Sequence, residues 1–163
     1  MTIIIKNKET LIFEDFKFKC CIGKKGTTKD KIEGDIKTPK GIFSLGKVYY
    51  RKDRDIKPIT KLDSICINKK MGWCNDVTNK KYNRLININK NIKHEKMFRK
   101  DYKYDYVIPI NYNTKKIKIG KGSAIFIHLT KNYKPTVGCI ALKKKDFLIL
   151  LKLINKKTKI KII

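Results

Sequence analysis

Short runs in which apolar and polar residues alternate recur along the whole chain. In one of them, Phe16, Phe18 and Cys20 alternate with Lys17 and Lys19. A period of two places one set of side chains on each face of a strand, so it predicts a sheet with one buried and one solvated face. The predicted strands cover residues 3–5, 16–22, 41–50, 62–67, 85–88, 106–110, 117–119, 124–129, 138–142 and 158–163.

One segment has the longer period of a helix. Within residues 146–155, Phe147, Leu150, Leu151 and Ile154 lie at i, i+3, i+4 and i+7 and form one apolar stripe. A second, weaker helical pattern covers residues 91–100. No internal repeat and no linker rich in Pro, Gly or Ser divides the chain. We therefore predict a single, mainly β domain over residues 1–163, with a few short helices.

The apolar content is sufficient for a core but not for a membrane span. Hydrophobic residues make up 41% of the 163 residues, and no apolar run approaches the roughly 20 residues that a membrane-crossing helix needs. The segment from Met1 to Lys6 has a short apolar stretch with no basic region before it, unlike a signal peptide. A removed signal, another export route and a cytoplasmic location all remain open.

The net charge of +27 comes from 41 Lys and Arg residues against 14 Asp and Glu residues. Only Arg51, Arg54, Arg84 and Arg99 are arginines, although proteins that read bases or clamp phosphates favour the planar fork of Arg. Lys, Ile and Asn are all abundant, as an AT-rich coding sequence produces. We interpret the charge as largely compositional. Its field still attracts polyanions such as an anionic cell wall, but no specific nucleic-acid motif is present.

The five cysteines are an odd number, so at least one thiol is unpaired within the chain. No CxxC pair occurs, and the two histidines lack zinc-ligand spacing to the cysteines, so no structural metal site is expected. Cys20 and Cys21 are adjacent in a predicted strand. They point to opposite faces, which disfavours a disulfide between them.

Two segments near the end of the chain carry candidate chemistry. An apolar strand delivers His128, and after a turn Gly138 precedes Cys139 at the start of another apolar segment. A thiolate is a strong nucleophile, and an imidazole can remove its proton and later protonate a leaving amine. A glycine before the nucleophile lets a carbonyl approach the backbone, whose N–H groups then form an oxyanion hole. By spacing alone, the pair also suits a structural Cys and His.

The two segments resemble the signature of the L,D-transpeptidase (YkuD-type) family. Residues 122–129 read GSAIFIHL and residues 135–142 read PTVGCIAL, similar to a subgroup motif GSAIFxHL … PTxGCxAL. Further blocks that resemble this subgroup lie at residues 25–29, 33–35, 37–43, 72–76, 82–84, 94 and 104–106. The resemblance covers nearly the whole chain in the right order.

This resemblance implies a β-sandwich of mixed sheets with the catalytic Cys and His at one end of a cleft. It implies that Cys139 attacks an L,D peptide bond of a peptidoglycan stem and that backbone N–H groups near Gly138 hold the oxyanion. His128 would protonate the departing D-alanine. An amine would then resolve the thioester as a cross-link, or water would resolve it as a carboxypeptidase. No metal or organic cofactor is required.

The resemblance also places a set of residues in the substrate groove: Trp73, Asn75, Asp76, Tyr82, Asn83, Arg84, His94 and Thr136. Taken alone, Trp73 equally suits a core, His94 suits a surface or capping role, and Cys74 suits a buried bystander. One position departs from the better-known branch of the family, which has Arg two places after the nucleophile where this chain has Ala141. Which cation holds the substrate carboxylate stays open, with Arg84 and Lys29 among the candidates.

The resulting prediction is a monomeric enzyme of the cell envelope or periplasm whose partners are peptidoglycan stem peptides. Two other functions fit the sequence. One is a nonenzymatic basic protein that binds polyanions or nucleic acid, with steeply salt-dependent affinity and no thiol reactivity. The other is an L,D-carboxypeptidase or cysteine peptidase on the same fold, which would form a thioester with other acyl donors.

Overall fold

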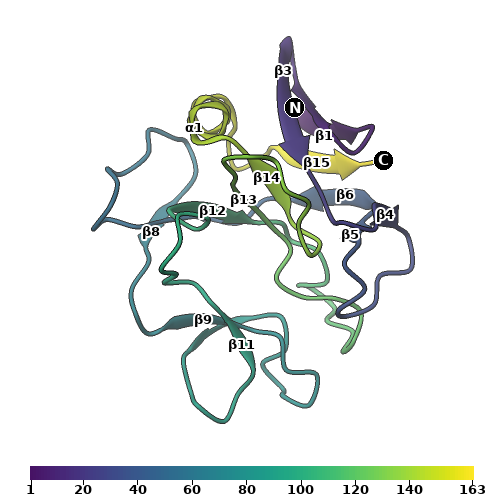
Figure 1. Ribbon diagram of the computed structural model, residues 1–163, viewed down its shortest axis with the longest axis vertical. Coiled ribbons are helices and arrows are strands. Elements are labelled where there is room, and N and C mark those ends of the chain that lie inside the picture. Colours follow the sequence, from purple (N-terminus) through teal and green to yellow (C-terminus); the bar gives the residue numbers. More distant parts are fainter.

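The computed structural model describes residues 1–163, and strands dominate it (Figure 1). The strands are β1 (Thr2–Lys6), β2 (Thr10–Phe13), β3 (Phe16–Cys21), β4 (Thr27–Thr28), β5 (Thr38–Pro39), β6 (Gly41–Ser44), β7 (Val48–Tyr50), β8 (Ser64–Cys66), β9 (Met71–Cys74), β10 (Leu85–Asn87), β11 (His94–Lys96), β12 (Tyr106–Pro109), β13 (Phe126–Leu129), β14 (Ile140–Leu142) and β15 (Lys159–Ile162). The helix is α1 (Lys144–Leu153).

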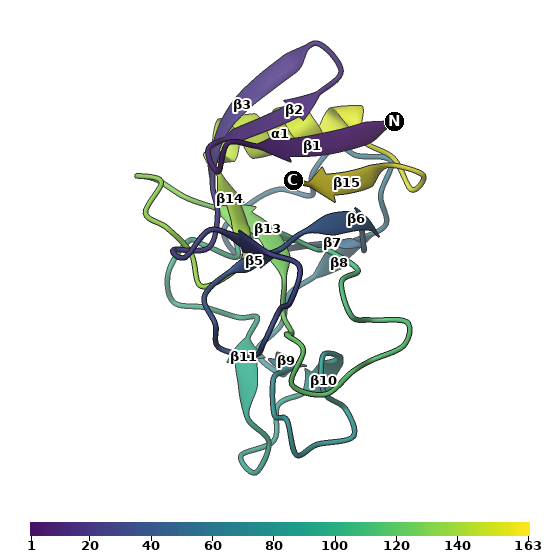
Figure 2. The same ribbon diagram turned by 90° about the vertical axis from the view of Figure 1, so that its right-hand side faces the viewer.

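Ten strands form one curled sheet in the order β6-β15-β1-β2-β3-β14-β13-β12-β7-β8. Three of its pairs are parallel, namely β1 with β15, β13 with β14, and β7 with β8, and the others are antiparallel. A three-stranded sheet, β10-β9-β11, lies at the opposite end of the molecule from the β1–β3 strands in both views (Figures 1 and 2). The predicted mainly β fold of mixed sheets is confirmed.

Helix α1 confirms the helical stripe, with its start two residues earlier than predicted. Phe147, Leu150 and Leu151 are buried, and the Phe147 ring stacks on Tyr106 with 6.2 Å between the ring centroids. The stripe thereby joins the main core of 25 buried residues between the helix and the large sheet. No helix in the structure is long and apolar enough to cross a bilayer.

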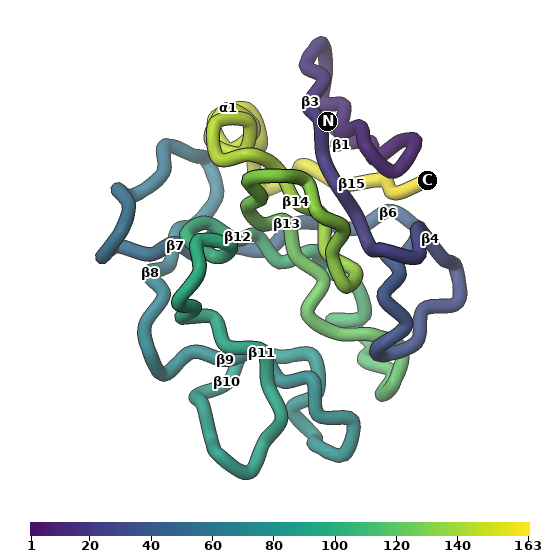
Figure 3. The backbone as a smooth tube through the Cα atoms, in the orientation of Figure 1, coloured from purple at the N-terminus to yellow at the C-terminus, as the bar shows by residue number.

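A second, smaller apolar cluster joins the large sheet to the three-stranded sheet. Its eight buried residues include Trp73 from β9, Phe126 from β13 and Cys139 from the segment before β14. The candidate nucleophile therefore sits where the two sheets meet. Figure 3 follows the chain through this region, where β9 and β11 lie below β12.

Two predicted elements are wrong. Residues 91–100 are not helical, because β11 pairs antiparallel with β9 and takes the place of a helix turn. Their apolar residues, Ile92, Met97 and Phe98, also lack the spacing of a helical stripe. Residues 117–119 form a loop, because the side chain of Asn113 takes the place of a strand partner at Lys118. Asn113 Oδ1 accepts the Lys118 N–H, and Asn113 Nδ2 donates to the Lys118 carbonyl. Five strands were not predicted: β2, β4, β5, β9 and β11.

Candidate active site

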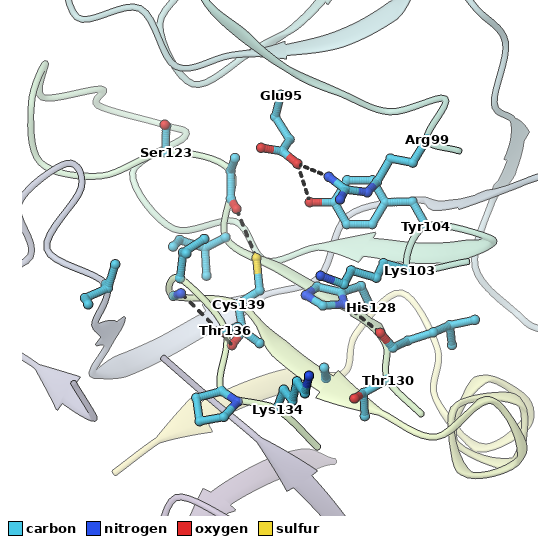
Figure 4. Close-up of a pocket in the computed structure, with 18 of the residues that line it drawn as sticks. Glu95, Arg99, Lys103, Tyr104, Ser123, His128, Thr130, Lys134, Thr136 and Cys139 are labelled. Atoms are coloured by element: carbon cyan, nitrogen blue, oxygen red, sulfur yellow. Dashed lines mark hydrogen bonds and ion pairs between the residues drawn. The ribbon is translucent and has the colours of Figure 1, made fainter. Parts of the chain in front are cut away.

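His128 and Cys139 are brought together by the register of two parallel strands. Ile127 of β13 lies opposite Ile140 of β14, and His128 lies opposite Ala141. One step back along both strands places Cys139 beside Phe126, whose N–H points at Cys139 Sγ at 3.4 Å. Side chains two positions apart share a face of a sheet, so His128 and Cys139 project from the same face. Figure 4 shows the imidazole next to the thiol.

The Cys139 thiol is buried and protonated. Its side chain is 5% exposed, and Sγ donates to the carbonyl oxygen of Ala124 at 3.3 Å. Burial raises the pKa of Cys139 to about 12, although the Phe126 N–H acts in the opposite direction. At neutral pH the group is therefore a thiol, and it needs a base in order to act as a nucleophile.

His128 has the tautomer that such a base requires. Its Nδ1–H donates to the backbone carbonyl of Leu129 at 3.0 Å, which leaves Nε2 without a proton. Burial lowers the pKa of His128 to about 4, against the raising effect of that carbonyl. The edge of the Tyr104 ring packs on the imidazole with 5.6 Å between centroids. The site thus holds a neutral thiol and a neutral imidazole.

The loop that carries Cys139 is fixed by two threonine hydroxyls. The Gly138 carbonyl accepts a hydrogen bond from Thr38 Oγ1 at 2.9 Å, and the Gly138 N–H donates to Thr136 Oγ1 at 3.1 Å. Thr136 Oγ1 in turn donates to the Cys139 carbonyl at 2.6 Å. The Cys139 N–H makes no hydrogen bond within the chain, whereas that of Gly138 is taken. Of these two donors, Cys139 is the one available to an oxyanion.

Gly138 has a backbone conformation that residues with a Cβ rarely adopt. Its φ is +145°, and a Cβ built there would lie 3.0 Å from the Lys37 carbonyl oxygen. Both the conformation and the close approach of the β5 segment therefore require glycine at this position.

A cleft of about 700 Å³ opens over the two side chains. It runs from the loop around Ser123, past Cys139, to Lys103 on the His128 side (Figure 4). Of the residues predicted from the sequence, five line it: Cys139, His128, Gly138, Asn75 and Thr136. The Thr136 hydroxyl forms hydrogen bonds with the Gly138 N–H and the Cys139 carbonyl. The Asn75 Oδ1, in contrast, is buried without a hydrogen-bond partner.

The other predicted groove residues do not line this cleft: Trp73, Asp76, Tyr82, Asn83, Arg84 and His94. The Trp73 indole packs edge-on against Phe126 with 5.2 Å between centroids, and its Nε1–H donates to Asn83 Oδ1 at 2.9 Å. Asn83 Oδ1 also accepts the Ala124 N–H at 3.1 Å, and Nδ2 donates to the carbonyls of Tyr112 and Asn113. Trp73 therefore packs on the Phe126 side chain of β13, and Asn83 fixes both the Trp73 indole and the Ala124 backbone just before that strand.

The remaining four have separate surroundings. The Tyr82 hydroxyl donates to Glu33, which does line the cleft. Asp76 accepts hydrogen bonds from the N–H and hydroxyl of Thr78. Arg84 lines a different cleft of about 410 Å³. The His94 ring packs against Gly72, its Nδ1–H donates to the Ile92 carbonyl at 2.6 Å, and its Nε2 is buried without a partner.

A charged network beside Cys139 was not predicted as part of the site. The Tyr104 hydroxyl donates to Glu95 Oε1 at 3.1 Å, and Arg99 Nη1 donates to the same oxygen at 2.8 Å. Arg99 also pairs with Asp101 at 2.7 Å. Burial raises the pKa of Tyr104 well above its usual range. Glu95 and Arg99 stand four residues apart, a spacing that also suits an ion pair on a helix.

No group of three or more His, Cys, Asp or Glu side chains is arranged to hold a metal ion. All five cysteines are free thiols. The buried Cys139 thiol, the neutral His128 imidazole and the free Cys139 N–H form an arrangement that is suited to acyl transfer.

Comparison with known proteins identifies the family of the chain. A family model for the L,D-transpeptidase catalytic domain (YkuD) matches residues 1–162. The solved structure of the helical cell shape determining protein Pgp2 from Campylobacter jejuni is similar over 99% of this chain, with a TM-score of 0.54 and 19% identity. A point mutant of Pgp2 is similar over the same share, with a TM-score of 0.52 and 20% identity. No curated protein matches the chain.

The present chain covers 46% of the Pgp2 chain, so it spans less than half of that protein's length. At this level of identity the structural likeness concerns the fold alone. The family match extends over all but the last residue. On that basis, the chain belongs to the L,D-transpeptidase catalytic-domain family.

Proposed function

We propose that the protein is a cysteine acyltransferase that cleaves an L,D peptide bond in peptidoglycan stem peptides, with Cys139 as nucleophile and His128 as base. The observation that carries the proposal is the shared face of β13 and β14. From it both side chains project into one cleft, with an unprotonated His128 Nε2. Membership of the L,D-transpeptidase family supports the substrate class.

In the first step, the Cys139 proton passes to His128 Nε2 while Sγ bonds to the carbonyl carbon of the scissile bond. The carbonyl π electrons move to oxygen, where the free Cys139 N–H stabilises the negative charge. The tetrahedral intermediate collapses, the C–N bond breaks, and His128 gives its proton to the departing D-alanine amine. A thioester on Cys139 remains.

In the second step, an amine of another stem or a water molecule attacks the thioester. His128 Nε2 takes the proton of the attacking group, and the thiolate leaves and recovers that proton. The amine yields a cross-link and water yields a trimmed stem, so both activities use the same residues. Similarity to a helical cell shape determining protein supports a role in shaping the wall.

We also propose where and in what form the protein acts. We assign residues 1–163 to one catalytic domain that works as a monomer in the cell envelope or periplasm. The net charge of +27 adds a general attraction to an anionic wall. The protein's own side chains suffice for each proton transfer above.

The test is acylation by a carbapenem, a reactive mimic of the stem peptide, read by intact mass. We expect a single adduct on the wild-type protein and none on Cys139→Ala. Cys66→Ala serves as the matched control, because Cys66 is the exposed thiol, and this variant should still be acylated. Release of D-alanine from a stem tetrapeptide then tests the substrate.

Folded protein that gives no Cys139-dependent adduct would contradict the proposal and favour the basic binding function. An adduct without any stem-peptide cleavage would instead indicate a cysteine peptidase acting on another substrate.

A further inference from the structure

Four cationic side chains line the cleft: Lys31, Arg99, Lys103 and Lys134. Two of them already have carboxylate partners. Lys31 is buried and pairs with Asp35, and Arg99 pairs with both Glu95 and Asp101. Neither Lys103 nor Lys134 forms an ion pair, so these two ammonium groups are available to an anionic ligand.

Lys103 is held against the strand that carries His128. Its carbonyl accepts the Leu129 N–H at 3.0 Å, and its own N–H donates to Asp101 at 3.1 Å. The ammonium contributes to the lowered pKa of His128, after the larger effect of burial. Figure 4 shows the Lys103 side chain alongside the imidazole. An unpaired positive charge therefore lies on the His128 side of Cys139.

The other end of the cleft, around Ser123, holds a carboxylate that forms no ion pair, while Lys31 there is paired with Asp35. Glu33 lines it there and accepts the hydroxyl hydrogens of Ser123 and Tyr82. Ser123 lies across Cys139 from His128 in Figure 4. A ligand carboxylate at that end would meet Glu33, so the charge distribution directs a carboxylate towards Lys103.

The chemistry of the leaving group selects the same end. His128 donates its proton to the departing amine, so the departing amino acid lies on the His128 side. In a terminal amino acid, the carboxylate is attached to the carbon that bears this amine. We infer that Lys103 binds the carboxylate of the leaving D-amino acid and thereby restricts cleavage to stems that end at the L,D bond. The inference rests on the proposed function.

Neither of the two cations that the sequence suggested lines the main cleft. Arg84 lines the separate smaller cleft, and Lys29 is exposed and does not line the main one. Lys103 thus supplies the positive charge that the family's other branch places two residues after the nucleophile, where Ala141 stands here.

The experiment compares two probes, a stem tetrapeptide ending in D-alanine and the same peptide ending in D-alaninamide. The wild-type kcat/KM should favour the free acid about tenfold or more, the effect of one charge-assisted hydrogen bond. Lys103→Gln should remove most of this preference by slowing the acid alone, and Lys103→Arg should retain it. Lys131→Gln is the matched control, because the Lys131 ammonium stacks 4.4 Å from the Tyr102 ring centroid and lies outside the cleft lining.

Three results would overturn the assignment while leaving the proposed function intact. They are equal wild-type rates on both peptides, an equal fall on both peptides in Lys103→Gln, and loss of the preference in Lys134→Gln but not in Lys103→Gln. The second result would mean that Lys103 acts on His128 alone. Absence of Cys139-dependent release from either peptide would contradict the proposed function itself, and the assignment with it.

Discussion

The Thr38 hydroxyl donates to the carbonyl oxygen of Gly138 at 2.9 Å and accepts the N–H of Gly23 at 2.9 Å. Thr38 is fully buried and lies 100 positions before Gly138 in the sequence. One hydroxyl thus connects β5, the loop after β3 and the loop that carries Cys139. The geometry at the nucleophile therefore depends on the first quarter of the chain as well as on the residues around Cys139.

Replacing Thr38 with Val should destabilise the protein. Val has nearly the shape of Thr but leaves the Gly23 N–H and the Gly138 carbonyl buried without partners, at a cost of about 1–3 kcal/mol. Urea unfolding measures this change, and carbapenem acylation of Cys139 should slow in parallel. Thr38→Ser keeps the hydroxyl and should retain acylation. A Val variant with wild-type stability and acylation rate would disprove this role.

Alanine at Gly138 should affect acylation far more than alanine at Gly120. Both glycines have positive φ, but a Cβ at Gly138 would lie 3.0 Å from the Lys37 carbonyl oxygen, whereas a Cβ at Gly120 meets nothing within 4 Å. We expect Gly120→Ala to cost about 1 kcal/mol from backbone strain alone. Gly138→Ala should cost roughly 1–3 kcal/mol and should also displace the nucleophile loop.

Acylation rates and urea unfolding of both variants give the comparison. An equal effect of the two substitutions on acylation would show that the contact with Lys37 is unimportant.

Lowering the pH should destabilise the folded protein, because its buried His128 resists protonation. The folded pKa is lowered from 6.5 to about 4, so between these values the unfolded chain binds a proton that the folded chain does not. Stability is therefore full above pH 6.5 and falls as the pH drops towards 4, by about 3 kcal/mol for this group. Urea unfolding of wild type and His128→Gln at pH 7.5 and pH 4.5 measures this change in the free energy of unfolding. The wild type should lose more stability than the variant, and equal losses would rule out this origin.

Asn83→Ala should loosen the packing of Trp73 on Phe126 and the backbone just before β13. The substitution removes the acceptor of the Trp73 indole and of the Ala124 N–H, and its donors to two loop carbonyls. We expect a loss of about 2–4 kcal/mol and a changed emission of Trp73. Exposed Asn91 offers the control, since Asn91→Ala should change stability by about 0.5 kcal/mol or less. Unchanged Trp73 emission in Asn83→Ala would argue against this role.

Local patterns predicted most of the strands and the helix, because each depends on the period of its own residues. The strands that present His128 and Cys139 were predicted for this reason, but their parallel register was not, since it depends on pairing across the sheet. Trp73 and Asn83 show a second limit. A motif identifies residues near a site, yet it does not distinguish a side chain that lines the cleft from one that packs against the residues around it.

The Glu95–Arg99 pair shows a third limit. Its spacing fits a helix, and only pairing of β11 with β9 reveals that the two charges instead meet Tyr104 beside the cleft. Lys103 carried no sequence signal at all among 41 basic residues. It became distinct only when the partners of the other cations in the cleft were known.

The place of β15 has a consequence for how the protein folds. This strand, Lys159–Ile162, lies inside the large sheet between β1 and β6. During synthesis, β1 and β6 have been made long before β15 emerges, and until then each leaves one edge without its partner. Pairing between such distant segments is slow, and open strand edges invite aggregation. The ten-stranded sheet is therefore complete only once residues 159–162 have paired with both β1 and β6, and a chain that lacks this pairing exposes those two edges.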